Sequence, residues 1–209
     1  MLGEYIKNIA MLCKQLILAS RSPRRKQLLE EAGLKFSIDP ATEFEEILGS
    51  EDLTPEVVAI HNAEGKAHEI AKKHANAYIL GVDTIGAYQH HILGKPKDIA
   101  DAKRILQILN GTTHEVISAI CVVSTDENGG IERKKSHAEK TLVKFAKMSP
   151  GEIDRYLESG ESMDKAAAFA IQGLGSLFIK KIDGNYDNVV GLPMCKLYQM
   201  FKEFGEEMI

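Results

Sequence analysis

Two long runs of strand-forming residues flank a turn-rich loop, and this pair constrains the fold more than any other feature of the sequence. The runs cover residues 116–124 and 131–147, and the loop between them is DENGG at 126–130. Because Asn and Gly close tight turns between antiparallel strands, the pattern predicts one long hairpin. The second arm is rich in charged residues, so we expect it to lie away from the centre of a sheet.

Helices and strands alternate on both sides of this hairpin. Short apolar runs at 16–19, 77–82 and 92–93 are typical of buried strands, and the apolar segments 166–171 and 177–182 follow later in the chain. Helical periodicity, N-cap residues and prolines at first helical positions predict helices over residues 24–31, 55–74, 98–110, 150–160 and from Pro193 onward. Together these elements predict an α/β fold with a mixed sheet and flanking helices.

Composition places the chain among ordinary globular proteins. Of its 209 residues, 44% are hydrophobic and 27% are charged, and no repeat or linker divides them. We therefore expect a single domain over residues 15–209, with two lobes around a central cleft, preceded by an N-terminal extension at 1–14. The net charge of -4 argues against nucleic acid as the main partner, because that binding needs a basic surface.

The sequence also bears on location. The first 15 residues lack the long apolar region and cleavage site of a secretory signal, and no stretch is long enough to span a membrane. The three cysteines, Cys13, Cys121 and Cys195, are odd in number and widely spaced, which fits neither a disulfide scaffold nor a zinc site. We expect a cytoplasmic protein without a membrane partner.

Two adjacent arginines open the first predicted helix. Arg24 and Arg25 lie where the helix dipole and free backbone N–H groups prefer a negative charge, so a bound anion would resolve the conflict. Ser20 and Ser22 add hydroxyl donors at the same strand-to-helix turn. The turn is therefore a candidate phosphate site, and the alternative is a solvated helix end with ordinary surface arginines.

Carboxylates that could serve catalysis or bind a metal lie in two places. Asp83 follows a predicted buried strand, and ligands gather at the carboxyl ends of strands in open α/β sheets. It could act as a general base or hold a divalent cation, although it could also merely cap the following turn. Glu43, Glu45 and Glu46 could supply a second oxygen ligand, or could form an ordinary solvated loop.

Two lysines occupy positions where a packed side chain is expected. Lys66 lies at the edge of the apolar stripe of the 55–74 helix, and Lys95 precedes Pro96 in a short rigid segment. Both could bind phosphate, and for Lys66 the alternative is a side chain that reaches solvent past apolar neighbours. The chain lacks a P-loop, and its segment 173–178, expected between strands, lacks the last glycine of a dinucleotide fingerprint. The seven histidines show no metal-binding spacing, so we expect surface residues.

Taken together, these motifs resemble the Maf family of nucleotide pyrophosphatases from Leu16 to about Phe201. Each block alone is weak, but the combination is specific. The blocks are LILASRSPRR (16–25), GVDT (81–84), LGKPKD (93–98) with NGTTHEV (110–116), and DKAAAFAIQGLG (164–175) with NVVGLP (188–193).

The resemblance implies an elongated α/β fold related to inosine-triphosphate pyrophosphatases, with the active site in a cleft between two lobes. It also implies a divalent metal cofactor, Mg²⁺ or Mn²⁺, a nucleoside triphosphate substrate and a homodimer. By motif position, Asp83 becomes the catalytic base, and Glu46 and Asp83 become the metal ligands. The phosphate-binding set is then Ser20, Arg24, Lys66 and Lys95.

Substrate choice within the family follows from one motif. The branch that resembles dTTP/UTP pyrophosphatases has Ile-Gln-Gly, as residues 171–173 do here, whereas a branch acting on 7-methyl-GTP has Glu in place of the Gln. An amide both donates and accepts hydrogen bonds and can pair with a pyrimidine edge. The resemblance thus implies hydrolysis of dTTP and UTP to the monophosphate and pyrophosphate, with Arg24, Thr84 and Gln172 as specificity residues.

Two alternatives to this activity stay open. One is a 7-methyl-GTP pyrophosphatase of the same family, and the other is a regulatory binding protein of cell division, given the family's link to septum formation. The chain also departs from the family at Ala167, where Gly is usual, and at Gly86, where a β-branched residue is commoner. We expect Ala167 to crowd a close backbone approach.

Overall fold

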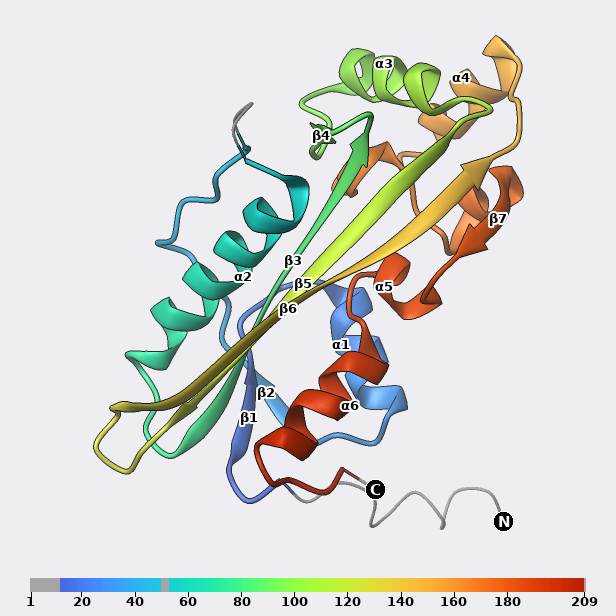
Figure 1. Cartoon of the computed structure of the whole chain (residues 1–209). Helices are drawn as coiled ribbons and strands as arrows, with labels where there is room; N and C mark the ends of the chain where they lie inside the picture. The colour runs from blue at the N-terminus through green and yellow to red at the C-terminus, as the bar shows by residue number, and fades with distance from the viewer. Residues whose placement is uncertain (1–11, 50–52, 209) are drawn as a thin grey trace, which may run out of the picture.

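The computed structural model describes residues 12–49 and 53–208, and in these residues seven strands form one mixed sheet (Figure 1). The strand order is β2-β1-β3-β5-β6-β7, with the short β4 paired to β3 alone. Strand β1 lies parallel to β2 and β3, and all the other pairs are antiparallel. The strands are β1 (Gln15–Leu18), β2 (Phe36–Ile38), β3 (Ala77–Tyr88), β4 (His91–Leu93), β5 (Thr113–Thr125), β6 (Ile131–Phe145) and β7 (Ile179–Asp183).

Helices cover both faces of the sheet and one of its ends (Figure 1). Both faces of the sheet are apolar at its centre, because alternate residues of β3 point to opposite faces. Leu80 packs with α1 and α6 on one face, whereas Ile79 packs with α2 on the other. The α-helices are α1 (Pro23–Glu31), α2 (Pro55–Ala71), α3 (Ile99–Leu109), α4 (Pro150–Glu158), α5 (Tyr186–Val190) and α6 (Met194–Glu203).

A third core lies at the far end of the long strands. There α3 and α4 pack with the ends of β5 and β6 through residues such as Leu106, Val116, Phe145 and Tyr156. Strands β3, β5 and β6 run the length of the molecule and join this lobe to the one that contains α1, α2 and α6 (Figure 1). The predicted mixed α/β fold with two lobes is therefore confirmed.

The hairpin prediction is confirmed, and its charged arm, β6, lies at the edge of the sheet along most of its length but inside the sheet at its end. Strand β6 pairs with β5 from residue 131 to 144, but β7 pairs with it only from Leu142 to Phe145. The charged residues 132–140 therefore form an edge, whereas the apolar end of the strand lies inside the sheet. The capping box of Ser149 and Glu152 is also present at the start of α4.

Several boundaries differ from the predictions for local reasons. Helix α2 ends at Ala71, three residues before the predicted end, and α3 begins at Ile99, whose side chain is 61% exposed in the first turn. Residues 166–168 and 173–178 are short 3₁₀ helices, so the glycine-containing segment does not lie between two strands. None of the helices in the described part of the chain has the length and apolar content needed to span a membrane.

Candidate functional site

A cleft of about 1340 Å³ opens between the two lobes, and it gathers all the catalytic, phosphate-binding, specificity and metal residues implied by the resemblance, whereas Glu43 and Glu45 lie outside it. Its walls come from the start of α1, the loop before α2, the middle of β3, the loop after β4 and the segment 164–172. The predicted site residues that line it are Ser20, Arg24, Glu46, Lys66, Asp83, Thr84, Lys95 and Gln172.

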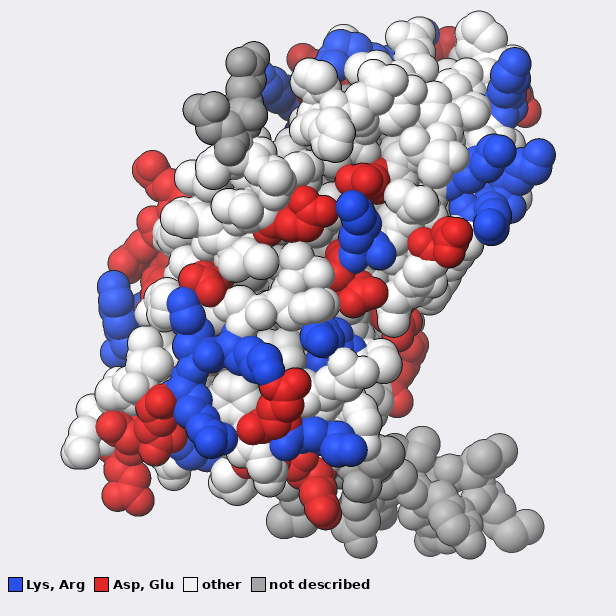
Figure 2. All heavy atoms as spheres, viewed as in Figure 1, with Lys and Arg blue, Asp and Glu red and all other residues white. Residues whose placement is uncertain are grey.

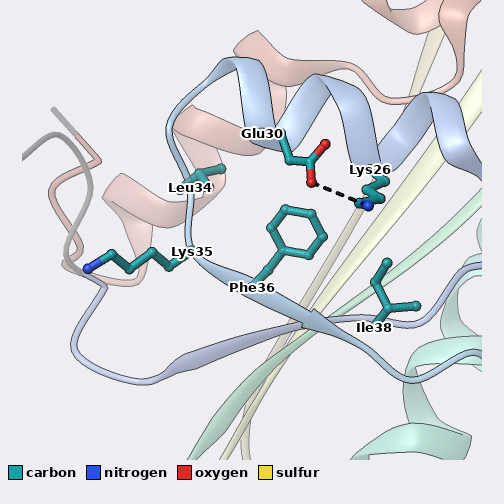
Figure 3. A pocket seen from close by; sticks show the side chains of 6 residues that line it. All are labelled: Lys26, Glu30, Leu34, Lys35, Phe36 and Ile38. Atoms are coloured by element: carbon teal, nitrogen blue, oxygen red, sulfur yellow. Dashed lines mark ion pairs between the residues drawn. The ribbon is translucent and has the colours of Figure 1, made fainter. Parts of the chain in front are cut away.

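A second hollow lies beside α1 and β2 (Figure 3). Two of its side chains form an exposed ion pair, in which Lys26 Nζ lies 3.5 Å from Glu30 Oε1, and the rest of its wall is Leu34, Lys35, Phe36 and Ile38. It contains none of the residues singled out above. The large cleft is therefore the candidate site.

Asp83 lies in the interior of β3, not at its end. The strand continues to Tyr88 because β5 stays paired with it, and Asp83 lies opposite Ala119. On the other side of β3, pairing with β1 stops at Leu80, where β1 itself ends. The cleft therefore opens at the carboxyl end of β1, which exposes the edge of β3 to helix and loop residues. Asp83 was chosen because its own strand was predicted to end beside it. That reason is wrong, because the strand that ends there is β1, although Asp83 does line the cleft.

One ammonium group links the two predicted metal carboxylates. Lys66 Nζ lies 2.6 Å from Glu46 Oε1 and 2.7 Å from Asp83 Oδ1. Asn62 donates its amide to Asp83 Oδ2 at 3.2 Å, so both oxygens of this 5% exposed carboxylate have a donor. Gly81 permits this approach of α2, because a Cβ there would lie 2.1 Å from the carbonyl oxygen of Ala63.

The loop that carries Glu46 is fixed by side chains of α2. Glu69 accepts hydrogen bonds from the backbone N–H groups of residues 42–44, at 2.8 to 3.1 Å. Asn62 accepts from the N–H of Ile47 at 2.9 Å and donates to its carbonyl at 3.1 Å. Burial works to raise the pKa of Glu46, but the charge and hydrogen bond of Lys66 outweigh it and hold this pKa below its usual value.

Replacing Glu69 with Gln is expected to lower the free energy of unfolding by about 1 to 2 kcal/mol, because an amide cannot accept all three N–H groups. Burial works to raise the pKa of Glu69, but the three N–H groups hold it below its usual value. The stabilisation is therefore complete above the carboxyl's pKa in the unfolded chain and is lost as pH falls through the lower folded value. Urea unfolding should show the variant's deficit at pH 7 shrinking below about pH 4. A deficit that is constant with pH would contradict this role.

Arg25, predicted with Arg24 to open the candidate phosphate turn but not among the residues implied by the resemblance, organises the turn before α1 through hydrogen bonds of its own. It donates to Ser20 Oγ at 2.9 Å, to Thr84 Oγ1 at 3.0 Å and to the carbonyls of Val82 and Gly191 at 3.1 and 3.0 Å. Burial lowers its pKa to about 10, and the charge of Asp83 opposes that effect. Arg25 thus holds Ser20, β3 and the end of α5 together, and it keeps its charge at neutral pH.

Arg24 points into the cleft with part of its guanidinium uncommitted. Its Nε donates to the carbonyl of Val190 at 3.3 Å, the single hydrogen bond that this side chain makes to the described residues. Burial lowers its pKa, and the charge of Asp164 opposes that effect. Ser22 is the N-cap residue of α1 as predicted, but its hydroxyl caps none of the described N–H groups of that helix. The start of α1 therefore offers N–H groups and a guanidinium to the same space.

The remaining predicted residues come from three parts of the chain. Thr84 Oγ1 is already engaged with Arg25, with Ser118 at 2.9 Å and with the carbonyl of Gly191. Its hydroxyl therefore has little hydrogen-bonding capacity left for a ligand. Lys95 and Gln172 line the cleft, and neither side chain bonds to any residue that the structure describes. Their polar groups are free to meet a ligand.

The expectation of surface histidines is wrong for His114. This side chain is 1% exposed and packs edge-on against Phe145 and Phe169. Neither ring nitrogen bonds to a described residue, and burial lowers its pKa to about 4, so the ring is neutral. No local pattern predicts this burial, because His114 lies at the start of β5, before the apolar run from which the strand was predicted.

Two carboxylates of the cleft could each give an oxygen to a divalent cation. Within the described residues, no three His, Cys, Asp or Glu side chains gather as a metal site. Glu46 and Asp83 nevertheless meet at one point, and Mg²⁺ commonly binds one or two carboxylates together with substrate phosphates. The three cysteines, all in the described part of the chain, are free thiols.

Fold and site together define an α/β protein whose cleft sets basic side chains beside a pair of carboxylates. The chain belongs to the family of Maf-like proteins, whose model matches residues 15–204. A dTTP/UTP pyrophosphatase of Bacillus pumilus is 45% identical, and the match covers 91% of this chain and 97% of that protein. A dTTP/UTP pyrophosphatase of Agathobacter rectalis is 43% identical over 93% of this chain and 99% of that protein. Among solved structures, the Ham1 protein of Staphylococcus aureus aligns with a TM-score of 0.49 and 14% identity, over 92% of this chain and all of that one.

Proposed function

We propose that this chain hydrolyses dTTP and UTP to the nucleoside monophosphate and pyrophosphate. The observation that carries the proposal is the buried carboxylate of Asp83, which faces a cleft that also holds Arg24, Lys66 and Lys95. Such a cleft presents a proton acceptor beside several cations, as hydrolysis of a polyphosphate needs. The relatives named above supply the nucleotide class.

Asp83 is proposed to act as the general base. Its carboxylate takes a proton from a water molecule as the water oxygen attacks the α-phosphorus. The bond from that phosphorus to the oxygen bridging to the β-phosphorus breaks, and pyrophosphate leaves. Arg24, Lys66, Lys95 and the hydroxyl of Ser20 bind the phosphates and stabilise the charge on the leaving group. Arg25 positions Ser20 through its hydrogen bond.

Glu46 and Asp83 are proposed as the ligands of a divalent cation, Mg²⁺ or Mn²⁺. When bound, such an ion neutralises phosphate charge and polarises the P–O bonds. Gln172 is proposed to read the base edge with its amide, with Arg24 and Thr84 as the other specificity residues of the same cleft. Since the Thr84 hydroxyl is engaged, its contribution would come from shape and from the alignment of Arg25.

We further propose a homodimer in the cytoplasm, with residues 15–209 as one domain. The exposed free thiols of Cys13 and Cys195 support a reducing compartment. Basic and acidic side chains are intermingled over the face shown in Figure 2, which gives no broad basic surface there for nucleic acid. Sedimentation of the purified chain tests the dimer.

The decisive experiment measures both pyrophosphate and orthophosphate released from dTTP, UTP and 7-methyl-GTP. We expect pyrophosphate from the two pyrimidine nucleotides, with at least about tenfold lower kcat/KM for 7-methyl-GTP. Faster hydrolysis of 7-methyl-GTP would assign the chain to the other branch. Release from none of a broad nucleotide panel would favour the regulatory binding protein.

A further inference from the structure

The ammonium group of Lys66 is surrounded by oxygen atoms, as a bound metal ion would be. Its ammonium has three N–H donors, and three oxygens face it, from Glu46 at 2.6 Å, from Asp83 at 2.7 Å and from the carbonyl of Val82 at 3.4 Å. The two carboxylates come from different elements, a loop and β3, and the ammonium is their shared partner. The side chains of Lys66 and Asp83 are 13% and 8% exposed, whereas that of Glu46 is 43% exposed, so the ammonium is shielded but the pair is open to the cleft at Glu46.

We propose that Lys66 keeps the affinity of the nucleotide-free protein for divalent metal low by occupying the position between Glu46 and Asp83. This rests on the proposed function, which assigns these two carboxylates to the metal. A divalent cation and an ammonium repel each other at contact distance, so both cannot share the same pair of carboxylates without loss of affinity.

A triphosphate offers Lys66 another set of oxygens. The lysine has a flexible four-carbon side chain, and the cleft beyond it already carries Arg24 and Lys95, which draw phosphates toward the same space. When the ammonium turns to the phosphates, Glu46 and Asp83 become free for the metal. Metal and nucleotide binding are then coupled, and each strengthens the other by the same factor.

The test is a titration of the full chain with Mn²⁺ in the absence of nucleotide, followed by the paramagnetic resonance signal of free Mn²⁺. Lys66→Gln removes the charge but keeps an amide donor, and it should bind Mn²⁺ at least about tenfold more tightly than the wild type. Lys97→Gln is the matched control, because Lys97 also lines the cleft but its charge acts on Asp101, whereas it is not among the charges that lower the pKa of Glu46. It should change the affinity by about twofold or less.

Two further variants locate the effect. Lys66→Arg restores the charge and should bind Mn²⁺ as weakly as the wild type, which also covers the case in which Lys66→Gln folds poorly. The double variant Lys66→Gln/Glu46→Gln should not show the increase in Mn²⁺ affinity that is expected for Lys66→Gln alone. An unchanged or weaker Mn²⁺ affinity in Lys66→Gln, an equal gain in Lys97→Gln, or a gain retained in the double variant would each overturn the proposal. The pyrophosphate assay of the wild type is separate, so its failure would remove the proposed function without altering the Mn²⁺ result.

Discussion

Replacing Asp83 with Asn is expected to lower kcat for pyrophosphate release by about 10³-fold, because an amide cannot take a proton from the attacking water. The surroundings add a second reason. Lys66 and Asn62 both donate to this carboxylate, one to each oxygen. An asparagine has one oxygen, so its NH₂ group must face one of the two donors.

Steady-state kinetics with dTTP and UTP check this expectation, together with urea unfolding to measure the stability change. Glu45→Gln is a suitable control, since Glu45 is an exposed acid in the loop that carries Glu46. It should leave kcat within about twofold. A rate for the Asp83→Asn protein within a few-fold of the wild type would remove Asp83 from the role of base.

The residues found from the sequence share a local signal. Arg24 stands out because a cation opens a helix, and Asp83 because a carboxylate interrupts an apolar run. The sequence placed Asp83 at the end of its own strand, whereas the relevant strand end is that of β1. Local pattern identifies an unusual residue, but the neighbouring strand that stops beside it depends on pairing across the sheet.

The residues that were missed act over long distances along the chain. Arg25 bonds to Gly191, which lies 166 positions later, and no local pattern separates it from Arg24. For Asn62 and Glu69, however, a signal was present. With Lys66 they lie at positions i, i+4 and i+7 of α2, which places three polar side chains on one face of a largely buried helix. Buried polar groups need partners, so that stripe alone indicates that a polar loop or strand faces α2.

Gly86 and Ala167 explain each other's departure from the family pattern. A Cβ added at Gly86 would lie 2.5 Å from the Cβ of Ala167, closer than atoms pack. Ala167 itself has φ 57 and ψ 23, the left-handed conformation in which glycine is favoured. Compared with the family pattern, this chain has its glycine at strand position 86 and a side chain at turn position 167. The crowding expected at Ala167 is relieved because Gly86 has no Cβ.

A double-mutant cycle tests this exchange. Gly86→Ala alone should lower the free energy of unfolding by about 2 to 3 kcal/mol, because it overpacks the contact. Ala167→Gly alone should change it by about 1 kcal/mol or less, since relief of the left-handed alanine offsets the lost methyl packing and added chain entropy. In the double variant Gly86→Ala/Ala167→Gly the clash is gone, and stability should return to within about 1 kcal/mol of the wild type.

Urea unfolding of the four proteins gives the coupling energy, and Gly94→Ala serves as the control. A Cβ at Gly94 has no described atom within 4 Å, so stability there should change by about 0.5 kcal/mol or less. Additive effects at Gly86 and Ala167 would contradict the exchange. The segment that contains Ala167 also carries Lys165 and Gln172 along the cleft wall. Gly86→Ala should therefore raise KM for the nucleotide as well, and the double variant should restore it, because the strand sets the position of the wall that carries Gln172, the residue proposed to read the base.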